Sequence, residues 1–431
     1  MRASLTAPAW AILEYFSYPI LVFVSTPWFL QHLGVQRYGY WMMLNAVVGL
    51  GGFLATGTGM ATTQHVAAGR GRRDVHGVER TVRAALALAL AGGLFACVAM
   101  AATYFAAWEL LARRMSDPAE LAPLMLAAAL LVALEQIDGV FASSFRGAEQ
   151  FALAARIEVA CKTAQILAAL LTVLMSDRIA VLYATLVGVA VVRAGVKGWL
   201  VQRTLAPRLL PARDGVAVLI RDARWGWVQG LGGLLFGVAD RLLIGAVLGS
   251  TRLGWYSIAA QLPQQIHAVC AAGMSVILPR VGRASQDADP AAPLRRLALR
   301  AAAVNVAASS VMAVPLLLLG PAILSTWLGP AVAEACAHIM SVLTLAYWLL
   351  AVNVAPHFML LGLGRMRFVA LSNLVAGAAL LIALVELLPV LGLVGAGVAR
   401  IVYGAVLLVN VVPLVTLLRD PSSWPGSKPS A

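Results

Sequence analysis

The chain has 431 residues, of which 61% are hydrophobic and 12% charged, and its mean hydropathy is +0.86. A soluble domain averages roughly half apolar and about a quarter charged residues, so this composition excludes a soluble globular protein. The apolar residues stand in blocks of about twenty or more along the whole chain, which favours many helical spans over a single anchor or the alternating segments of a barrel.

Runs of apolar residues bounded by charge, Gly or Pro predict twelve membrane spans. The first run follows Pro8, and we expect it to remain as a span rather than to be removed as a signal peptide. The predicted spans lie near 9–32, 41–66, 84–107, 121–145, 152–175, 179–201, 225–247, 254–279, 300–319, 337–361, 369–388 and 395–418.

Basic residues predict the orientation of these spans, because short cytoplasmic loops are enriched in Lys and Arg. With the N-terminus inside, the inner loops hold most of the 32 basic residues, and we count Arg193 and Lys197 among them. Both termini are therefore expected in the cytoplasm. The net charge of +13 fits contact with anionic lipid headgroups, without nucleic acid. The outer loops hold Arg37, Arg113, Arg114, Arg178 and Arg252.

The longest predicted loop, 202–224, is rich in Arg and Pro and separates six spans from six. We therefore predict two lobes of six helices each, related as parallel repeats. The expected division is an N-terminal lobe at 1–201, a cytoplasmic linker at 202–224, a C-terminal lobe at 225–418 and a cytoplasmic tail at 419–431.

Two short sequences recur in corresponding places of the two halves. LGVQRYGYW (33–41) and LGSTRLGWY (248–256) each follow the first span of a half, and GAEQF (147–151) and GRMRF (364–368) each follow the fourth. The first pair predicts a structural element, in which Gly permits a tight turn and Tyr and Trp anchor at the membrane interface.

Charged residues inside predicted spans are expensive and must face protein or water. Helical rise places Lys162 and Glu135 near the midplane of the membrane. Glu135 shares a helix face with Asp138, as Glu158 does with Lys162, so we expect Lys162 between carboxylates of adjacent spans. The set comprises Glu14, Glu135, Asp138, Glu158, Lys162, Asp240, Arg241, Glu386 and Arg400.

Two interpretations of these charges stay open. Glu158 with Lys162, and Asp240 with Arg241, could be ion pairs that lock helices together. The three cations Lys162, Arg241 and Arg400 in otherwise apolar spans favour instead a path for an anionic headgroup.

The eighth span contains QLPQQIHAV, with amides at Gln261, Gln264 and Gln265 around Pro263. Amides offer a sugar both donors and acceptors, although a kinked helix whose amides bond to neighbouring groups fits equally well. The isolated His residues and the four separated Cys predict neither a metal site nor a disulfide framework. We expect transport without catalysis or a cofactor, because nucleotide, nucleophile and metal motifs are absent from the sequence.

Five stretches follow one another in a recognisable order: FLQHLGVQRYGYWMML, RGAEQF, ADRLLIGAVLGSTRLGWYSIAAQL, TWLGPAVAEACAHI and LPVLGLVGAGVAR. In that order, and with those predicted membrane sides, they resemble the polysaccharide transporter family, the O-antigen and exopolysaccharide flippases. This family belongs to the multidrug/oligosaccharidyl-lipid/polysaccharide flippase superfamily, and the resemblance covers about residues 9–418.

The resemblance implies two six-helix lobes around a central cavity. The implied flippase moves undecaprenyl-pyrophosphate-linked oligosaccharide to the periplasmic leaflet of the bacterial inner membrane, for O-antigen, capsule or exopolysaccharide assembly, and a polysaccharide polymerase could be a partner. Arginine and lysine would then bind pyrophosphate, and carboxylates would couple transport to protons or Na⁺. The corresponding residues are Lys162, Arg241 and Arg400 for pyrophosphate, Gln261, Gln264 and Gln265 for sugar, and Glu14, Glu135 and Asp138 for coupling.

Other classes fit the sequence less well. AAGRGRRD (67–74) is similar to a loop of the major facilitators but lacks their Asp-Arg pair before the last Gly. A multidrug exporter of the same superfamily would favour a cavity without three buried cations. A polysaccharide polymerase or ligase typically carries a large periplasmic loop, and a scaffold would not need charges inside its spans.

Overall fold

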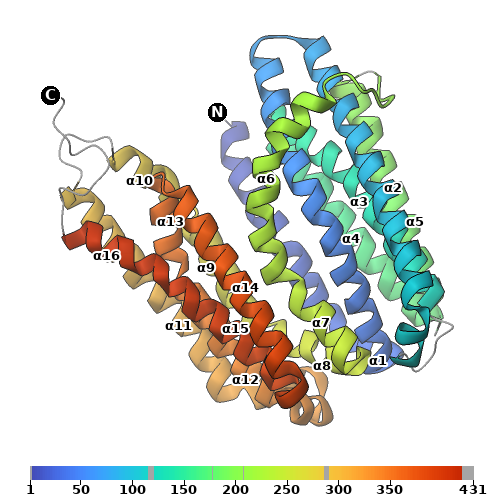
Figure 1. Cartoon of the computed structure of the whole chain (residues 1–431), viewed down its shortest axis with the longest axis vertical. Helices are drawn as coiled ribbons and strands as arrows, with labels where there is room; N and C mark the ends of the chain where they lie inside the picture. The colour runs from blue at the N-terminus through green and yellow to red at the C-terminus, as the bar shows by residue number, and fades with distance from the viewer. Residues whose placement is uncertain (1, 115–120, 177, 207, 286–290, 420–431) are drawn as a thin grey trace. The chain divides into compact units, whose positions relative to one another are not determined.

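The computed structural model describes residues 2–114, 121–176, 178–206, 208–285 and 291–419. Helices account for nearly all of these residues, and the described ranges contain no strand. Figure 1 shows the helices running as long rods through each part of the chain. The all-helical, polytopic membrane fold predicted from hydropathy is confirmed.

Contacts divide the chain into two compact units, residues 1–254 and 255–431. The first unit contains α1 (Arg2–Gly71), α2 (Val75–Arg114), α3 (Leu121–Gly147), α4 (Phe151–Met175), α5 (Ile179–Thr204), α6 (Val216–Gly237), α7 (Ala239–Leu248) and the start of α8 (Ser250–Ala260). The second contains the rest of α8, α9 (Pro263–Met274), α10 (Ile277–Ala284), α11 (Ala291–Leu328), α12 (Pro330–Val352), α13 (Val354–Gly362), α14 (Met366–Leu391), α15 (Leu393–Leu407), the 3-10 turn η2 (Leu408–Asn410) and α16 (Val411–Arg419).

Eight helical segments of the described chain are long and apolar enough to cross a membrane. They correspond to the third to sixth and ninth to twelfth predicted spans, because they lie on α2 to α5 and on α11 to α16. The other four predicted spans fall on α1, which covers two of them, on α6 with α7, and on α8 to α10. The twelve-span topology stays a prediction for those four segments.

Leu-Gly junctions break long helices in the same way at three places. Gly34 inside α1 has φ 70° and ψ 168°, Gly249 between α7 and α8 has φ 84° and ψ 173°, and Gly329 between α11 and α12 has φ 93° and ψ 164°. This backbone conformation is essentially restricted to glycine, since a Cβ would clash there. The first glycine of each recurring sequence therefore makes one kink, which explains why both copies keep it.

The two copies of the recurring sequence also pack against each other. A Cβ on Gly39 would collide with the carbonyl oxygen of Ser250, and a Cβ on Gly254 would lie 2.5 Å from the carbonyl oxygen of Val35. The second glycine of each copy thus lets α1 and α8 approach backbone to backbone. This reciprocal contact is the packing expected of a duplicated element.

Most aromatic residues of these copies lie inside the protein rather than at a membrane interface, which corrects the sequence expectation for them; Trp255 is only partly buried. Tyr38, Trp41 and Tyr256 are buried. Trp41 packs edge-on against Phe29, with ring centroids 4.5 Å apart, and against Tyr38 at 5.9 Å. Because the kinked helices continue through these residues, the rings point into the protein rather than into a loop.

In the first unit, α1 packs along α3, α4 and α6, and α3 packs along α2 and α5. Its apolar core includes Val82, Phe141, Phe145 and Val201. The helices α6 and α7, which follow the 202–224 segment, pack on α1 and so belong to this unit. Contacts therefore divide the chain at residue 254, whereas the division of the sequence into lobes at 202–224 stays a prediction.

In the second unit, α12 packs along α9, α11 and α15, and α14 packs along α15. Its core gathers Cys270, Leu294, Val354 and Met359 from three helices, α9, α11 and α13. Cys270 and Cys336 are buried as free thiols, and Cys97 and Cys161 are partly buried. Cys270 and Cys336 thus pack in the interior of the second unit.

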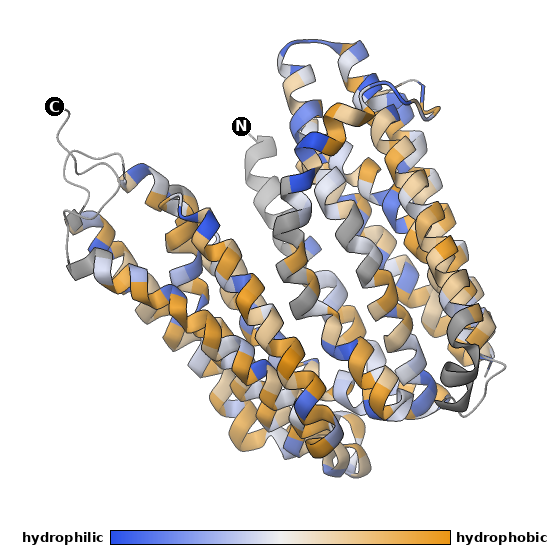
Figure 2. Ribbon diagram, in the orientation of Figure 1, coloured by the Kyte–Doolittle hydropathy of each residue, from blue (hydrophilic) through white to orange (hydrophobic). Residues whose placement is uncertain are grey.

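Hydrophobic residues predominate along the helices of both units (Figure 2). Phe95 on α2, Leu318 on α11 and Ile382 on α14 are each about two-thirds or more exposed. Exposure of many large apolar side chains is unusual in soluble proteins and is what lipid requires. In the first unit, hydrophilic residues gather at the end where α1 turns into α2 (Figure 2).

Candidate ion and substrate site

Three neighbouring helices of the first unit contribute paired charges at helical spacing. Helix α3 carries Glu135 and Asp138, α4 carries Glu158 and Lys162, and α5 carries Arg193 and Lys197. Residues three or four apart lie on one face of a helix, so each helix presents two charges to the others. The helices pack together, α3 on α5 and α4 on α5, which brings the six charges into contact.

The contacts form a chain of alternating charge. The Lys197 Nζ donates to Asp138 Oδ2 at 2.8 Å and to Glu158 Oε2 at 2.7 Å. The Arg193 guanidinium donates to Glu135 and lies 3.3 Å from Asp138 Oδ1. Three carboxylates and three cations balance, so the buried cluster carries no net charge.

Burial differs along this chain of charges. Lys197, Arg193 and Asp138 in the middle are buried, with Lys197 only 2% exposed, whereas Glu135 and Lys162 at the two ends are 33% and 27% exposed. Charges removed from water need partners to offset their desolvation, and the middle three have them. The ends are the members that a solute could reach.

The lysine held between two carboxylates is Lys197, not Lys162, which corrects the sequence expectation. Lys162 makes a 3.5 Å ion pair with Glu158 on its own helix. Arg193 and Lys197 were also expected in an inner loop, but both lie within α5, a helix long and apolar enough to span. Their four-residue spacing opposite Glu135 and Asp138 was the signal that could have revealed them.

Glu14 stands apart from the other two carboxylates predicted for ion coupling. Its Oε1 lies 3.2 Å from Arg146 Nη2, at the end of α3. Glu135 and Asp138 meet through the shared Arg193. All three predicted coupling carboxylates are therefore ion-paired in this structure.

Asp240 and Arg241 lie in the first turn of α7. The buried Asp240 carboxylate accepts the Arg241 backbone N–H at 2.8 Å. An acid in the first turn suits the positive end of the helix. Helix α7, which carries Arg241, packs on α1 within the first unit.

In the second unit, Arg400 is buried among tyrosines. It is 3% exposed on α15; its Nε donates to the Tyr256 hydroxyl at 2.8 Å, and its guanidinium lies 4.9 Å above the centre of the Tyr347 ring. Stacking on an aromatic face is a favoured geometry for a desolvated guanidinium.

The amides of the eighth predicted span surround a real helix break. Helix α8 ends at Ala260, Pro263 begins α9, and Gln265 Nε2 donates to the Gln261 carbonyl at 3.2 Å. The Gln265 side chain thus supplies a donor to a backbone carbonyl in the break between the two helices, while its own backbone N–H donates to the Leu262 carbonyl. Gln261 is buried, and Gln264 is partly buried beside it. For Gln265 the contact is the one expected of a kinked helix.

A ladder of amides and hydroxyls, which sequence reasoning missed, ties α14, η2 and the junction of α12 with α13. The Ser372 hydroxyl donates to Asn410 Oδ1 at 2.9 Å, and Asn410 Nδ2 donates to Asn353 Oδ1 at 3.1 Å. Tyr403 Oη lies 3.4 Å from Asn373 Oδ1. Isolated amides in apolar helices were the available signal, because each needs a partner away from water.

Residues 9–285 match the family described as "Polysaccharide biosynthesis protein", which is more than half of the chain. The chain belongs to this family. The resemblance noted in the sequence is thereby confirmed, and no curated protein matches the chain closely enough to add to it.

Comparison with solved structures shows that this chain shares its fold with known membrane proteins. It is similar to the lipid II flippase MurJ in an inward closed conformation, with 11% identity, 95% of this chain and 87% of that chain covered, and a TM-score of 0.72. It is also similar to an inward-facing multidrug resistance MATE family transporter of the MOP superfamily, with 14% identity, 95% of this chain and 96% of that chain covered, and a TM-score of 0.70. A third similar structure is the MATE multidrug transporter DinF-BH, with 14% identity, 96% of this chain and 95% of that chain covered, and a TM-score of 0.66.

On this fold, the predicted site residues of the polysaccharide biosynthesis protein belong to both compact units. Lys162, Arg241 and the three carboxylates lie in residues 1–254, and Arg400 with the three glutamines lies in residues 255–431. Within the described ranges, no three His, Cys, Asp or Glu side chains are grouped in a way that could hold a metal. The contacts described above for these residues are ion pairs, hydrogen bonds and one cation–π contact.

Proposed function

We propose that this protein is a flippase for undecaprenyl-pyrophosphate-linked oligosaccharide, moving it from the cytoplasmic to the periplasmic leaflet of a bacterial inner membrane. Both termini lie in the cytoplasm in this proposal. The observation that carries it is the family match: the chain belongs to a polysaccharide biosynthesis family and shares its fold with the lipid II flippase MurJ. The exported lipid then serves assembly of O-antigen, capsule or exopolysaccharide, with a polymerase as the downstream partner.

For substrate binding, we assign Lys162, Arg241 and Arg400 to the pyrophosphate. The guanidinium of Arg400 is buried beside two tyrosines, Tyr256 and Tyr347. Such an environment suits a phosphate and the sugar attached to it. Lys162 is the more accessible cation of the charge chain in α3 to α5. Gln261, Gln264 and Gln265 then hydrogen-bond the sugar beside the α8–α9 break.

For ion coupling, the carboxylates Glu14, Glu135 and Asp138 take up H⁺ or Na⁺. Glu135 is the best placed of the three, because it is the exposed end of the charge chain and its partner Arg193 is shared with Asp138. When an anion draws Arg193 away, Glu135 loses its counter-charge and gains affinity for a cation. Asp138 keeps Lys197 as a partner in that exchange.

The proposal is tested by deleting the gene in a strain without a second flippase. Carrier-linked oligosaccharide should accumulate and stay inaccessible to a lectin or a sugar-oxidising reagent applied to the outside of spheroplasts. Normal labelling at the periplasmic face would refute the flippase assignment. Complementation with R241Q or K162Q should give low labelling at wild-type protein levels in the membrane. The control R252Q removes an exposed arginine on α8 outside the proposed site and should complement fully.

A multidrug exporter is the second candidate, because two of the similar structures are MATE multidrug transporters with TM-scores of 0.70 and 0.66. Their fold alone is shared, at 14% identity. Cationic aromatic drugs would be repelled by the buried Arg400. An exporter should confer resistance to such dyes on a sensitive strain, whereas the flippase should leave dye accumulation unchanged.

A further inference from the structure

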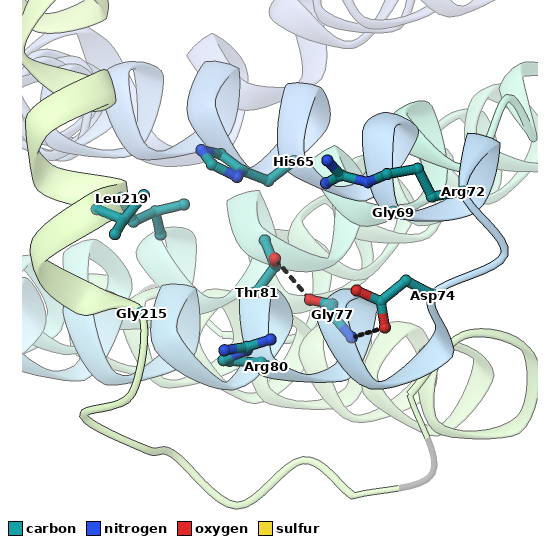
Figure 3. Close-up of a pocket in the computed structure, with 10 residues that line it drawn as sticks. His65, Gly69, Arg72, Asp74, Gly77, Arg80, Thr81, Gly215 and Leu219 are labelled. Atoms are coloured by element: carbon teal, nitrogen blue, oxygen red, sulfur yellow. Dashed lines mark hydrogen bonds between the residues drawn. The ribbon is translucent and has the colours of Figure 1, made fainter.

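A pocket lies at the hydrophilic end of the first unit, away from the charge chain of α3 to α5. It has a volume of about 180 Å³ and is bounded by the end of α1, the start of α2 and the start of α6. Figure 3 shows His65 and Arg72 on the α1 side and Arg80 with Thr81 on the α2 side, around a common space. Gly215 and Leu219 of α6 close it.

Arginines surround this pocket in excess over acids. Arg72 and Arg80 line it, and an adjoining pocket of about 340 Å³ is lined by Arg70 and Arg73. Asp74 borders both pockets as their shared carboxylate. Among the described residues, no carboxylate lies within ion-pair distance of the Arg72 or Arg80 guanidinium. The residues that line the two pockets therefore include four arginines and a single acidic residue, Asp74.

The turn that carries these arginines is held by its own backbone. The N–H groups of Arg72, Arg73 and Asp74 donate to carbonyls at 3.1, 3.0 and 2.8 Å, and Asp74 Oδ1 accepts the Gly77 N–H at 2.8 Å. The Thr81 hydroxyl donates to the Gly77 carbonyl at 2.8 Å. These backbone donors are committed to the turn itself, whereas the arginine guanidinium groups offer a planar fork of donors that matches phosphate.

The pocket lies at the start of the segment of α2 that is apolar enough to span a membrane, Val75–Phe105. Val75 is 61% exposed, and the other exposed leucine, valine and phenylalanine side chains of this segment lie further along the helix, from Leu90 to Phe105. A lipid whose tails lie on α2 would bring its headgroup to the turn. Helices α1 and α6, which both border the pocket, are also linked directly, because His65 Nε2 on α1 lies 2.8 Å from Asp222 Oδ2 on α6.

We propose that this pocket binds a phosphate-bearing anion, held by Arg72 and Arg80, and that membrane phospholipid headgroups supply it. The site differs from the one assigned to the transported substrate, and it does not rest on the flippase activity. A bound headgroup would join α1, α2 and α6 at the end of the first unit, where His65 and Asp222 already connect two of them.

The test uses the full-length purified protein in detergent and native mass spectrometry. Phosphatidylglycerol is titrated against wild type, R72Q/R80Q and the control R295Q/R296Q, which removes the same charge from an exposed stretch of α11. Losing two charge-assisted contacts should weaken retention of the lipid about tenfold or more in R72Q/R80Q and less than about twofold in the control. Equal losses in both double variants would overturn the proposal, since diffuse surface charge would then explain binding.

Two further arms identify the source of the phosphate and guard against misfolding. Inorganic phosphate is titrated in the same way. If the wild type binds it as strongly as phosphatidylglycerol and R72Q/R80Q loses that binding, the anion site is supported and its ligand comes from the aqueous phase, which overturns the phospholipid as the source. Binding of neither by the wild type would overturn the site. R72K/R80K keeps both charges without the bidentate fork and should bind with intermediate strength, while wild-type melting temperatures for all variants show that the fold is intact.

Discussion

Replacing Lys197 by methionine should destabilise the protein strongly, because this cation holds the centre of the charge chain in α3 to α5. Lys197 is 2% exposed and bonds Asp138 at 2.8 Å and Glu158 at 2.7 Å. Methionine keeps most of the volume and removes the charge. Taking one partner from a buried ion pair costs about 3 to 5 kcal/mol, since the acid left behind stays desolvated.

The expected value lies near the lower end of that range. Asp138 keeps Arg193 at 3.3 Å and Glu158 keeps Lys162 at 3.5 Å, so neither carboxylate is left entirely without a counter-charge. A loss of about 3 kcal/mol lowers the ratio of folded to unfolded protein by roughly two orders of magnitude. The matched variant K162M removes a 27% exposed lysine with a single 3.5 Å contact and should cost about 0 to 1 kcal/mol.

The assay is denaturant or thermal unfolding of the purified variants, followed by tryptophan fluorescence, with membrane levels measured in parallel. The double variant E158Q/K197M restores charge balance in the chain and should recover about 1 kcal/mol or more of the loss. If K197M proved as stable as K162M, the buried chain of charges would not stabilise the helices, and this reasoning would be wrong. If K162M is stable but fails to export the lipid, Lys162 is needed for transport and not for folding.

The remaining predictions concern the second unit and the recurring sequence. R400K should keep the charge but lose the planar stacking on Tyr347 and the Nε contact to Tyr256, so export should fall while membrane levels persist; unchanged export would exclude a substrate role that depends on the guanidinium. G254A should cost about 1 to 3 kcal/mol in unfolding measurements, because its Cβ would lie 2.5 Å from the Val35 carbonyl oxygen. The control G273A, whose Cβ meets nothing within 4 Å, should be neutral or slightly stabilising, and an equal loss in both would contradict the close-packing argument.

The sequence by itself determined the class of structure and the places where its helices bend. Hydropathy averaged over about twenty residues identifies a span whatever its neighbours are, so the all-helical polytopic fold was predictable. The kinks at Gly34 and Gly249 were also within reach, because a recurring glycine reports a local backbone requirement. The family followed from the same short sequences and was confirmed by the match over residues 9–285.

Only the tertiary structure decided which charges meet. The sequence placed Glu135, Asp138, Glu158 and Lys162 together on helix faces, yet Lys197 of α5 holds the bridging position. Pairing depends on how each helix is rotated and on which helix lies beside it, and neither quantity is contained in a hydropathy average. The burial of Tyr38 and the contact between the two recurring sequences were hidden for the same reason. Composition and local pattern fix what each helix is, and packing fixes what each side chain touches.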